Sequence, residues 1–244
     1  MRNFYRITHS LNPEILGNLD QVVIGKYSCS IYDEHFIDQI FFEKAKFDPI
    51  TAKVILAPGS KLTDLIKTSI VGIGLKLLLS GKFKSILEQN VHSGVEFFES
   101  PIFKDGIEFS NYYVLNAYEN RLDKVDFSKS EILLRNRKKS GGTETVLIEI
   151  KSLTQFLFNQ NLYQTKGGFL FINKLVLKKT EEDFILIRNV QGGAGYFVSD
   201  RLKCVLEENK CSGLEFMPSE LSQSEWLKVG GKRENIYGKP GRNF

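Results

Sequence analysis

The chain contains two copies of one short segment, and this internal repeat limits its possible folds more than any other feature. Aligned without a gap, residues 80–100 read SGKFKSILEQNVHSGVEFFES and residues 199–219 read SDRLKCVLEENKCSGLEFMPS. The copies share the serine at each end, a central asparagine and a Ser-Gly-x-Glu-Phe run. Self-similarity of this kind indicates one structural unit that is used twice.

Each copy has the pattern of a strand, a helix and a second strand. The apolar runs 77–79 and 196–198 precede the copies and are short enough for buried strands. Ser80 and Ser199 stand where a helix needs an oxygen to accept its unpaired first N–H groups, and apolar residues three and four apart follow. After the Ser-Gly turn, apolar and acidic residues alternate with the period of a half-buried strand. We therefore predict a βαβ unit in each copy.

Most of the remaining chain has the pattern of strands, because Val, Ile, Leu and Phe are dense there and Gly, Asn or charged residues separate the runs. One more short helix is expected after Ser152, and residues 37–45 are ambiguous. The expected strands are residues 3–7, 21–24, 111–116, 145–150, 168–172, 174–177 and 184–188.

These elements predict an α+β protein of two lobes, each carrying one copy of the strand-helix-strand unit, with mostly β structure between the copies. The first lobe is expected to span residues 1–105 and the second residues 106–226, with the join near a Lys-Asp-Gly turn. Residues 227–244 are expected to form a flexible basic tail, since glycines and a proline break up any helix or strand there.

Length and composition favour a globular protein of the cytoplasm. The 244 residues are 42 % hydrophobic and 25 % charged, which is ordinary for a chain with a real core. No apolar run follows the charged N-terminus as in a signal peptide, and residues 70–79 are too short to span a bilayer. The three cysteines lack the spacing of a disulfide framework or a zinc site. We therefore expect a cytoplasmic protein that makes no membrane contact.

We recognise no motif for a cofactor, a metal or a catalytic nucleophile. The glycines at 141–142 and 192–195 do not join a strand to a helix N-terminus, so they lack the context of a phosphate-binding loop. His9, His35 and His92 are scattered, without the converging partners that a metal or a Cys–His nucleophile needs. We expect no cofactor, no metal and no catalytic residue, although distant residues can also assemble an active site.

Two groups of polar residues are candidates for contact with a partner. Glu96 and Glu215 are the members of the repeat most suited to face one, because a charged residue between apolar ones lies on the open side of a half-buried strand. Asp126, Ser128 and Glu131 belong to the densest polar cluster in the interior of the chain. They suit either the cap of a turn or helix, or a recognition surface.

The formal net charge of +4 comes from 33 basic and 29 acidic residues, and it is too mild and too mixed to indicate nucleic-acid binding by itself. The one local excess lies in the tail, where Lys232, Arg233, Lys239 and Arg242 stand against Glu234 alone. A nucleic-acid-associated module that uses this tail is therefore one alternative interpretation, and its binding would weaken steeply with salt. The mild positive charge also argues against an inhibitor that mimics DNA.

Four short blocks occur in a fixed order along the chain. Residues 112–116 match Tyr-Tyr-x-Leu-Asn, and residues 126–131 match Asp-x-x-x-Ser-Glu. Residues 198–202 match Val-Ser-Asp-Arg-Leu before a helix, and residues 212–218 match Ser-Gly-Leu-x-Phe-x-Pro. This ordered set resembles a bacterial family of immunity proteins from polymorphic toxin systems, long catalogued only as a domain of unknown function.

The resemblance implies a protein that binds and neutralises a cognate toxin domain in the cytoplasm, and it assigns no catalytic residues. Tight inhibitory interfaces bury about 1,600 Å² and are anchored by aromatic residues or Arg, which makes the tyrosines candidates by residue type. An uncharacterised enzyme remains a further alternative, and the oligomeric state stays open. The candidate partner-binding residues are Tyr112, Tyr113, Asp126, Ser128, Glu131, Tyr163, Glu96 and Glu215.

Overall fold

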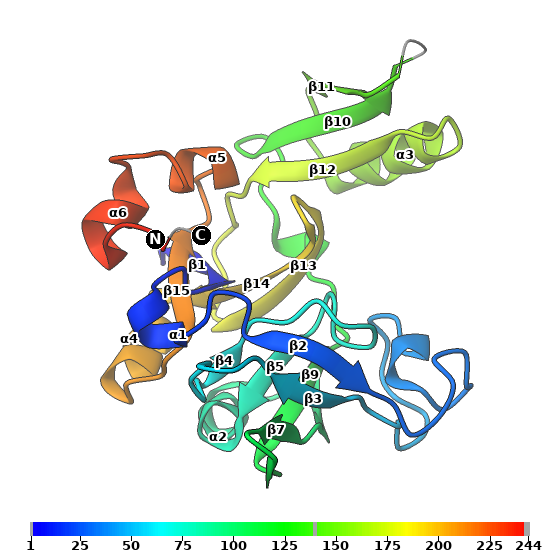
Figure 1. Cartoon of the computed structure of the whole chain (residues 1–244). Helices are drawn as coiled ribbons and strands as arrows, with labels where there is room; N and C mark the ends of the chain where they lie inside the picture. The colour runs from blue at the N-terminus through cyan, green and yellow to red at the C-terminus, as the bar shows by residue number, and fades with distance from the viewer. Residues whose placement is uncertain (1, 139–140, 242–244) are drawn as a thin grey trace.

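The computed structural model describes residues 2–138 and 141–241, and these residues form an α+β protein, as the sequence predicts (Figure 1). The helices are α1 (Pro13–Leu16), α2 (Gly81–Asn90), α3 (Leu153–Gln164), α4 (Asp200–Glu208), α5 (Gln223–Trp226) and α6 (Lys232–Tyr237). The first eight strands are β1 (Phe4–His9), β2 (Val22–Lys26), β3 (Lys53–Leu56), β4 (Leu65–Ile66), β5 (Leu77–Ser80), β6 (Val95–Glu99), β7 (Ile102–Lys104) and β8 (Ile107–Phe109). The others are β9 (Tyr112–Ala117), β10 (Glu131–Arg137), β11 (Thr143–Leu147), β12 (Phe169–Lys174), β13 (Phe184–Val190), β14 (Gly193–Ser199) and β15 (Leu214–Pro218).

The strands of the described chain form three sheets. One sheet has seven strands in the order β11-β10-β12-β13-β14-β1-β15. The two others have four strands each, in the orders β4-β5-β9-β6 and β2-β3-β7-β8. Two short 3-10 turns, η1 (Ile37–Gln39) and η2 (Leu122–Lys124), lie in the connections.

Both copies of the sequence repeat form a strand, a helix and a strand, but the two strands are not neighbours. In the first segment, β5 and β6 lie on either side of β9 and pair antiparallel with it. In the second segment, β14 and β15 lie on either side of β1 in the same way. The expected βαβ units are therefore split, because a third strand from elsewhere in the chain lies between their strands.

The inserted strands tie the two parts of the chain together. β1, near the N-terminus, completes the sheet of the C-terminal segment, whereas β9 completes the sheet of the N-terminal segment. The registers are equivalent, since Ser80 lies opposite Tyr112 in one sheet and Ser199 lies opposite Phe4 in the other. The boundary expected between residues 105 and 106 thus separates strands that share a sheet.

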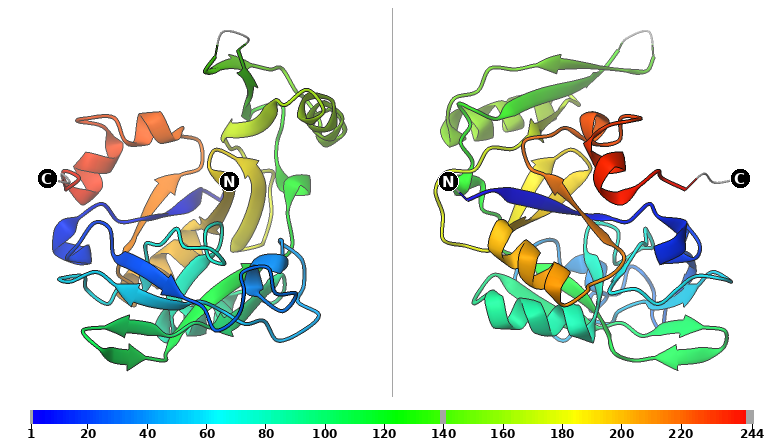
Figure 2. Two further views of the ribbon diagram at one scale, coloured as in Figure 1. Left: turned by 45° about the vertical axis from the view of Figure 1, so that its right-hand side comes forward. Right: turned by 90° about the vertical axis from the view of Figure 1, so that its left-hand side faces the viewer.

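Helices α2 and α4 lie side by side and run antiparallel (Figure 2). Lys82, in the first turn of α2, donates to the carbonyl of Asn209 just beyond the end of α4. Arg201, in the first turn of α4, donates to the side chain of Asn90 at the end of α2. The apolar stripes of both helices pack into one core with side chains from the sheets of both segments, and two further apolar clusters lie elsewhere in the molecule.

Serine caps begin both helices, as the sequence predicts. The hydroxyl oxygen of Ser80 accepts from the N–H of Phe83, and that of Ser199 accepts from the N–H of Leu202. Because such a cap contacts a backbone group only three residues away, its chemistry can be predicted without the tertiary fold.

β10, β11, β12 and α3 form an arm that projects from the rest of the molecule, and we call residues 131–174 the distal arm (Figure 1). α3 spans three turns and is longer than the short helix expected after Ser152. Sequence reasoning misses β10, because polar residues hide the alternation of Ile132 and Leu134, which are buried. The separate strand expected at 174–177 is wrong, since Lys174 is the last residue of β12 and the only strand pairing described at residues 175–177 is an isolated bridge between Leu177 and Val125.

The expectation of a tail without helix or strand is wrong for residues 232–237, which form α6. Arg233 on this helix is buried and donates to both carboxylate oxygens of Glu215, from Nε at 2.7 Å and from Nη2 at 2.6 Å. This pairing attaches the segment to β15 despite its flanking glycines. Lys232 and Lys239 are exposed, and Arg242 lies outside the described residues.

Candidate functional site

The antiparallel helices α2 and α4 create two equivalent junctions, and the first of them is filled. We call it the closed junction, formed by Asp64, Ser80, Lys82 and Ser212. Asp64 accepts hydrogen bonds from Ser80 Oγ at 2.6 Å and from the Ser212 N–H and Oγ at 2.8 and 3.0 Å. Lys82 Nζ lies 2.9 Å from the same carboxylate. The backbone continues the contact, because the Leu65 N–H donates to the Ser212 carbonyl at 3.0 Å.

The second junction, which we call the open junction, is formed by Asp183, Ser199, Arg201 and Ser93. Asp183 accepts hydrogen bonds from Ser199 Oγ and from the Arg201 guanidinium, whose Nε lies at 3.0 Å. Ser93 occupies the position of Ser212 in the repeat, but it is exposed. Within the described chain Ser93 donates no hydrogen bond to Asp183, whereas Ser212 donates to Asp64 at the closed junction. The open junction therefore lacks the serine contact that fills the closed one.

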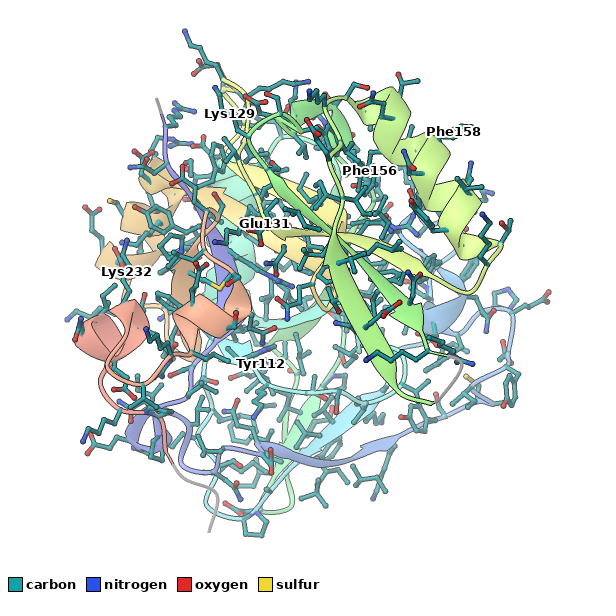
Figure 3. The ribbon with its side chains drawn as sticks, turned by 90° about the horizontal axis from the view of Figure 1, so that it is seen from above. Tyr112, Lys129, Glu131, Phe156, Phe158 and Lys232 are labelled. Carbon is teal, nitrogen blue, oxygen red and sulfur yellow. The ribbon has the colours of Figure 1, made fainter. Side chains whose placement is uncertain are left out.

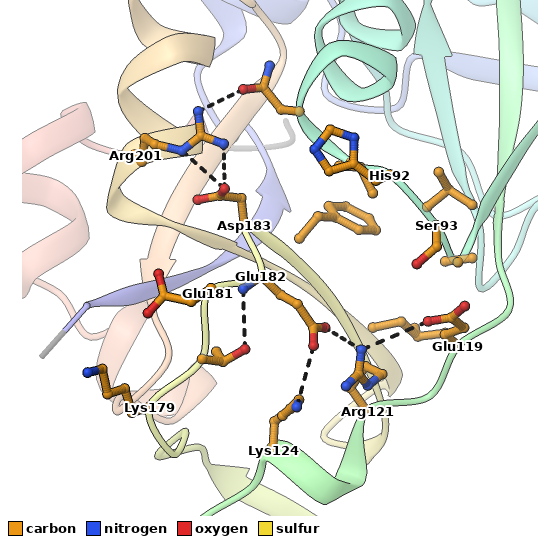
Figure 4. Close-up of a pocket in the computed structure, with 18 residues that line it drawn as sticks. His92, Ser93, Glu119, Arg121, Lys124, Lys179, Glu181, Glu182, Asp183 and Arg201 are labelled. Carbon is orange, nitrogen blue, oxygen red and sulfur yellow. Dashed lines mark hydrogen bonds and ion pairs between the residues drawn. The ribbon is translucent and has the colours of Figure 1, made fainter.

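A cleft of about 700 Å³ lies where the open junction is not filled (Figure 4). His92 and Ser93 line one side, after α2, and the residues before β13 line the other. Arg121 Nη1 lies 2.6 Å from a carboxylate oxygen of Glu182 and 3.9 Å from one of Glu119. Basic and acidic side chains therefore both line the cleft, and most of its carboxylates lie within ion-pair distance of a cation.

Both junction aspartates are ionised at neutral pH. Partial burial by itself would raise the pKa of Asp183, but hydrogen bonds from Arg201 and Ser199 outweigh it and hold that pKa below its usual value. Burial would also raise the pKa of Asp64, but hydrogen bonds from Ser80, Ser212 and Lys82 outweigh it and hold that pKa below its usual value. Carboxylates held in this way are poor proton acceptors, so the cleft is better suited to charge recognition than to general base chemistry.

The distal arm presents a second candidate surface. α3 carries no charged residue along its whole length, and it buries Phe156 while Leu157, Phe158 and Leu162 are exposed. Phe158 has 67 % of its surface exposed and points away from the arm's sheet (Figure 3). Leu147 on β11, at 69 %, and Phe169 on β12 add to the exposed apolar surface of the arm.

Basic side chains lie on the face of the arm's sheet opposite α3, because Arg135 pairs with Phe169 in the ladder whereas its neighbour Leu134 packs with Phe156 of α3. Arg135, Arg137 and Lys138 follow one another on and beside β10, and all three are exposed. None of them forms an ion pair with another described residue, although the Arg135 guanidinium lies 5.3 Å from the Phe171 ring centre. The arm therefore exposes apolar side chains on two faces, α3 and the opposite side of its sheet, and the basic residues lie beside the second. Exposed apolar surface of this kind is typical of a protein-binding site.

Of the residues predicted from sequence, the two tyrosines that begin β9 belong to the scaffold. Tyr112 is buried, donates from its hydroxyl to the Thr63 carbonyl at 3.1 Å, and has its pKa raised to about 12 by burial. Tyr113 is half-buried, with Lys84 Nζ 5.0 Å from its ring centre. The hydroxyl of Tyr112 is therefore not available to a partner.

The two repeat glutamates have different surroundings. Glu96 is half-buried and accepts from the Ala45 N–H at 2.9 Å and from Asn116 Nδ2 at 3.1 Å. Glu215 is 1 % exposed and pairs with Arg233. The expectation that Glu215 faces a partner therefore needs correction, because α6 covers it and its carboxylate is fully engaged inside the molecule.

The remaining predicted residues lie at or near the distal arm. Asp126 accepts a hydrogen bond from Ser128 Oγ at 2.6 Å, which with Lys129 lowers its pKa, so these residues form a capped turn. Glu131 begins β10 and accepts from the Asn173 side chain. Tyr163, on α3, is half-buried against the arm's apolar core. Of the predicted set, Ser128 alone is fully exposed.

Sequence reasoning misses Asp183, Arg201 and the apolar surface of α3. The sequence signal for α3 is the uncharged run from 153 to 164, which has no clear polar face. For the junctions the signal is an Asp that precedes each copy by the same spacing, Asp64 before Ser80 and Asp183 before Ser199. These aspartates lie outside residues 80–100 and 199–219, so an alignment restricted to the two copies does not include them.

Comparison with known proteins gives no match to any family model and no significantly similar curated protein. In the described part of the chain, no cluster of three or more His, Cys, Asp or Glu side chains is arranged to hold a metal ion. None of the described helices combines the length and apolar character needed to cross a membrane.

Proposed function

We propose that this protein is a cytoplasmic immunity protein that binds and neutralises a cognate bacterial toxin domain. The distal arm carries the proposal, because one projecting element exposes apolar side chains on α3 and, on the opposite face of its sheet, apolar side chains beside cations that form no ion pair with another described residue. Such a surface fits a partner that has apolar anchors within an acidic patch. The ordered sequence blocks that resemble immunity proteins give the proposal its specific form.

Phe158 is the residue on which the proposal is tested most directly. Its ring is the most exposed aromatic side chain of the arm, and large aromatic residues dominate protein interfaces. Coexpression of this protein with the toxin domain encoded next to it is expected to restore growth. Calorimetry is expected to give a nanomolar affinity between the two. Phe158→Asp is expected to weaken binding by at least about thirtyfold, as for a residue worth about 2 kcal/mol.

Ile107→Asp is the matched control. Ile107 on β8 is 61 % exposed, and it receives the same substitution on a surface away from the arm. This variant is expected to bind the toxin domain like the unmodified protein. Equal loss in both variants would point to misfolding, and rescue that is unaffected by Phe158→Asp would remove the arm from the proposal.

Salt dependence separates toxin binding from the nucleic-acid alternative. Association through a mixed surface is expected to change only a few-fold between low and physiological salt. Neutralisation of several phosphates by Lys and Arg would instead reduce affinity by orders of magnitude over that range. A steep salt slope with DNA or RNA, together with no rescue of growth, would favour the alternative.

A further inference from the structure

One half-buried cation has no counterpart in the other half of the molecule. Arg6 lies on β1 between Phe197 of β14 and Met217 of β15. The equivalent residue of β9 is Val114, between Leu78 of β5 and Phe98 of β6. Val114 is fully buried, so the fold at this position accepts an apolar side chain and does not require a guanidinium.

Arg6 is only partly satisfied. Its Nη2 donates to the Ala194 carbonyl at 2.8 Å, and no carboxylate of the described residues lies within ion-pair distance of it. Burial lowers its pKa to about 10, which still leaves it charged at neutral pH. A desolvated cation without a counter-ion is unfavourable unless something else supplies the negative charge.

The guanidinium faces a cavity of about 350 Å³, which we call the Arg6 pocket. Its apolar lining comes from Leu75, Met217, Trp226 and Leu227, and the turn at Gly192 also lines it. Gly192 has a φ of 86°, a left-handed conformation that glycine adopts without strain. The glycine run at 192–195, which lacks the context of a nucleotide loop, thus borders this pocket.

Arg6 shares the pocket with two other basic side chains, Lys67 and Lys76. Glu215 is neutralised by Arg233. Lys67 donates to the Leu19 carbonyl at 3.0 Å and lies 3.6 Å from the Asp20 carboxylate. Lys76, like Arg6, donates to one carbonyl, that of Ile40 at 2.8 Å. His9 is neutral at pH 7, since burial lowers its pKa to about 4.

We propose that the Arg6 pocket binds a small monocarboxylic acid with an apolar body. The planar fork of Arg6 matches the two oxygens of a carboxylate, and Met217 and Trp226 pack against the apolar body. The cavity volume lies at the lower end of the range for small-molecule sites. This binding is independent of the distal arm and of toxin neutralisation.

Trp226 makes the proposal easy to test, because it lines the pocket and is the only tryptophan in the chain. Octanoate is expected to change its fluorescence in a saturable manner. Octanol has the same body without the charge, and inorganic phosphate has charge without the body. Both are expected to bind at least about tenfold more weakly, since a hydrogen bond to a charged group is worth about 1.5–3 kcal/mol.

Arg6→Met is the decisive variant, because an apolar residue restores the arrangement seen around Val114 and keeps the fold. It is expected to weaken octanoate binding at least about tenfold, while Arg6→Lys retains part of it. Arg135→Met, on the exposed arm, is the matched control and is expected to bind octanoate normally. Equal binding of octanol and octanoate, equal binding of phosphate, or undiminished binding by Arg6→Met would each overturn the proposal.

Discussion

The closed and open junctions use equivalent residues, yet only one of them leaves space for a partner. At the closed junction the backbone at Gly213 approaches so closely that a Cβ there would lie 2.3 Å from the Leu65 carbonyl oxygen. At the open junction Gly94 instead meets the side chain of Glu119, with 3.1 Å between the same hypothetical Cβ and the nearest atom. Short backbone contacts fill one junction, whereas long charged side chains line the other.

Near-identical local sequence therefore does not determine the contacts that the two segments make with each other. Lys84 lies near the rings of Phe97 and Tyr113, and Lys203 lies near those of Phe216 and Tyr5, so these contacts within each unit are reproduced. The differences arise where each unit contacts residues outside the repeat. Substitutions at equivalent positions therefore test the comparison directly.

The largest difference is expected at the repeat glutamates. Arg233→Ala leaves the buried Glu215 carboxylate unpaired and is expected to reduce the free energy of unfolding by about 3–5 kcal/mol. Glu96→Gln, at the residue equivalent to Glu215, changes a half-buried carboxylate that accepts hydrogen bonds from neutral donors, and is expected to cost about 1 kcal/mol. Urea denaturation measures both values, and similar losses would contradict the assigned difference in burial.

The second difference concerns pH, because His9 on β1 is equivalent to Ala117 on β9. Burial, with a contribution from Lys67, lowers the His9 pKa from 6.5 to about 4. The unfolded chain then binds more protons than the folded chain between these values, so stability falls as pH falls through this window. We expect a loss of about 2 kcal/mol between pH 7 and pH 5.

His9→Ala gives β1 the residue that β9 has at this position, and it is expected to remove most of that pH dependence. Urea denaturation at pH 7 and pH 5 provides the measurement. His92→Ala is the control, because His92 is exposed and lines the open cleft. An unchanged slope in His9→Ala would show that other groups cause the acid sensitivity.

The smallest difference in stability is expected between the two junction serines, Ser212 and Ser93. Ser212→Leu removes the hydroxyl hydrogen bond to Asp64 and places a larger side chain in a filled junction, so a loss of about 1–2 kcal/mol is expected. Ser93→Leu places the same side chain in the open cleft and is expected to change stability by less than about 0.5 kcal/mol. Thermal unfolding measures both, and equal losses would mean that the open junction closes in solution.

Part of the candidate site can be predicted from the sequence, but most of it cannot. The capped turn at Asp126 and Ser128 follows from local side-chain chemistry, because the Ser128 hydroxyl donates to the Asp126 carboxylate only two residues away. Aromatic anchors are harder to predict from the sequence, since Tyr112 and Phe158 are both plausible by residue type. Only the structure shows that Tyr112 is buried and Phe158 is exposed. Asp183 and Arg201 are distant from Asn90 in the chain, so no local pattern connects them.

The sequence by itself determined the two strand-helix-strand segments and their serine caps, because periodicity and capping depend on residues a few positions apart. Only the tertiary structure decided that β1 and β9 separate the strands of each unit, that Arg233 buries Glu215, and that one junction stays open. Strand pairing and burial depend on contacts between residues far apart in the chain, and the side chains that meet there decide whether a junction fills. The same reason applies to Arg6 and Val114, which only the pairing of β1 and β9 with their neighbours identifies as equivalent positions.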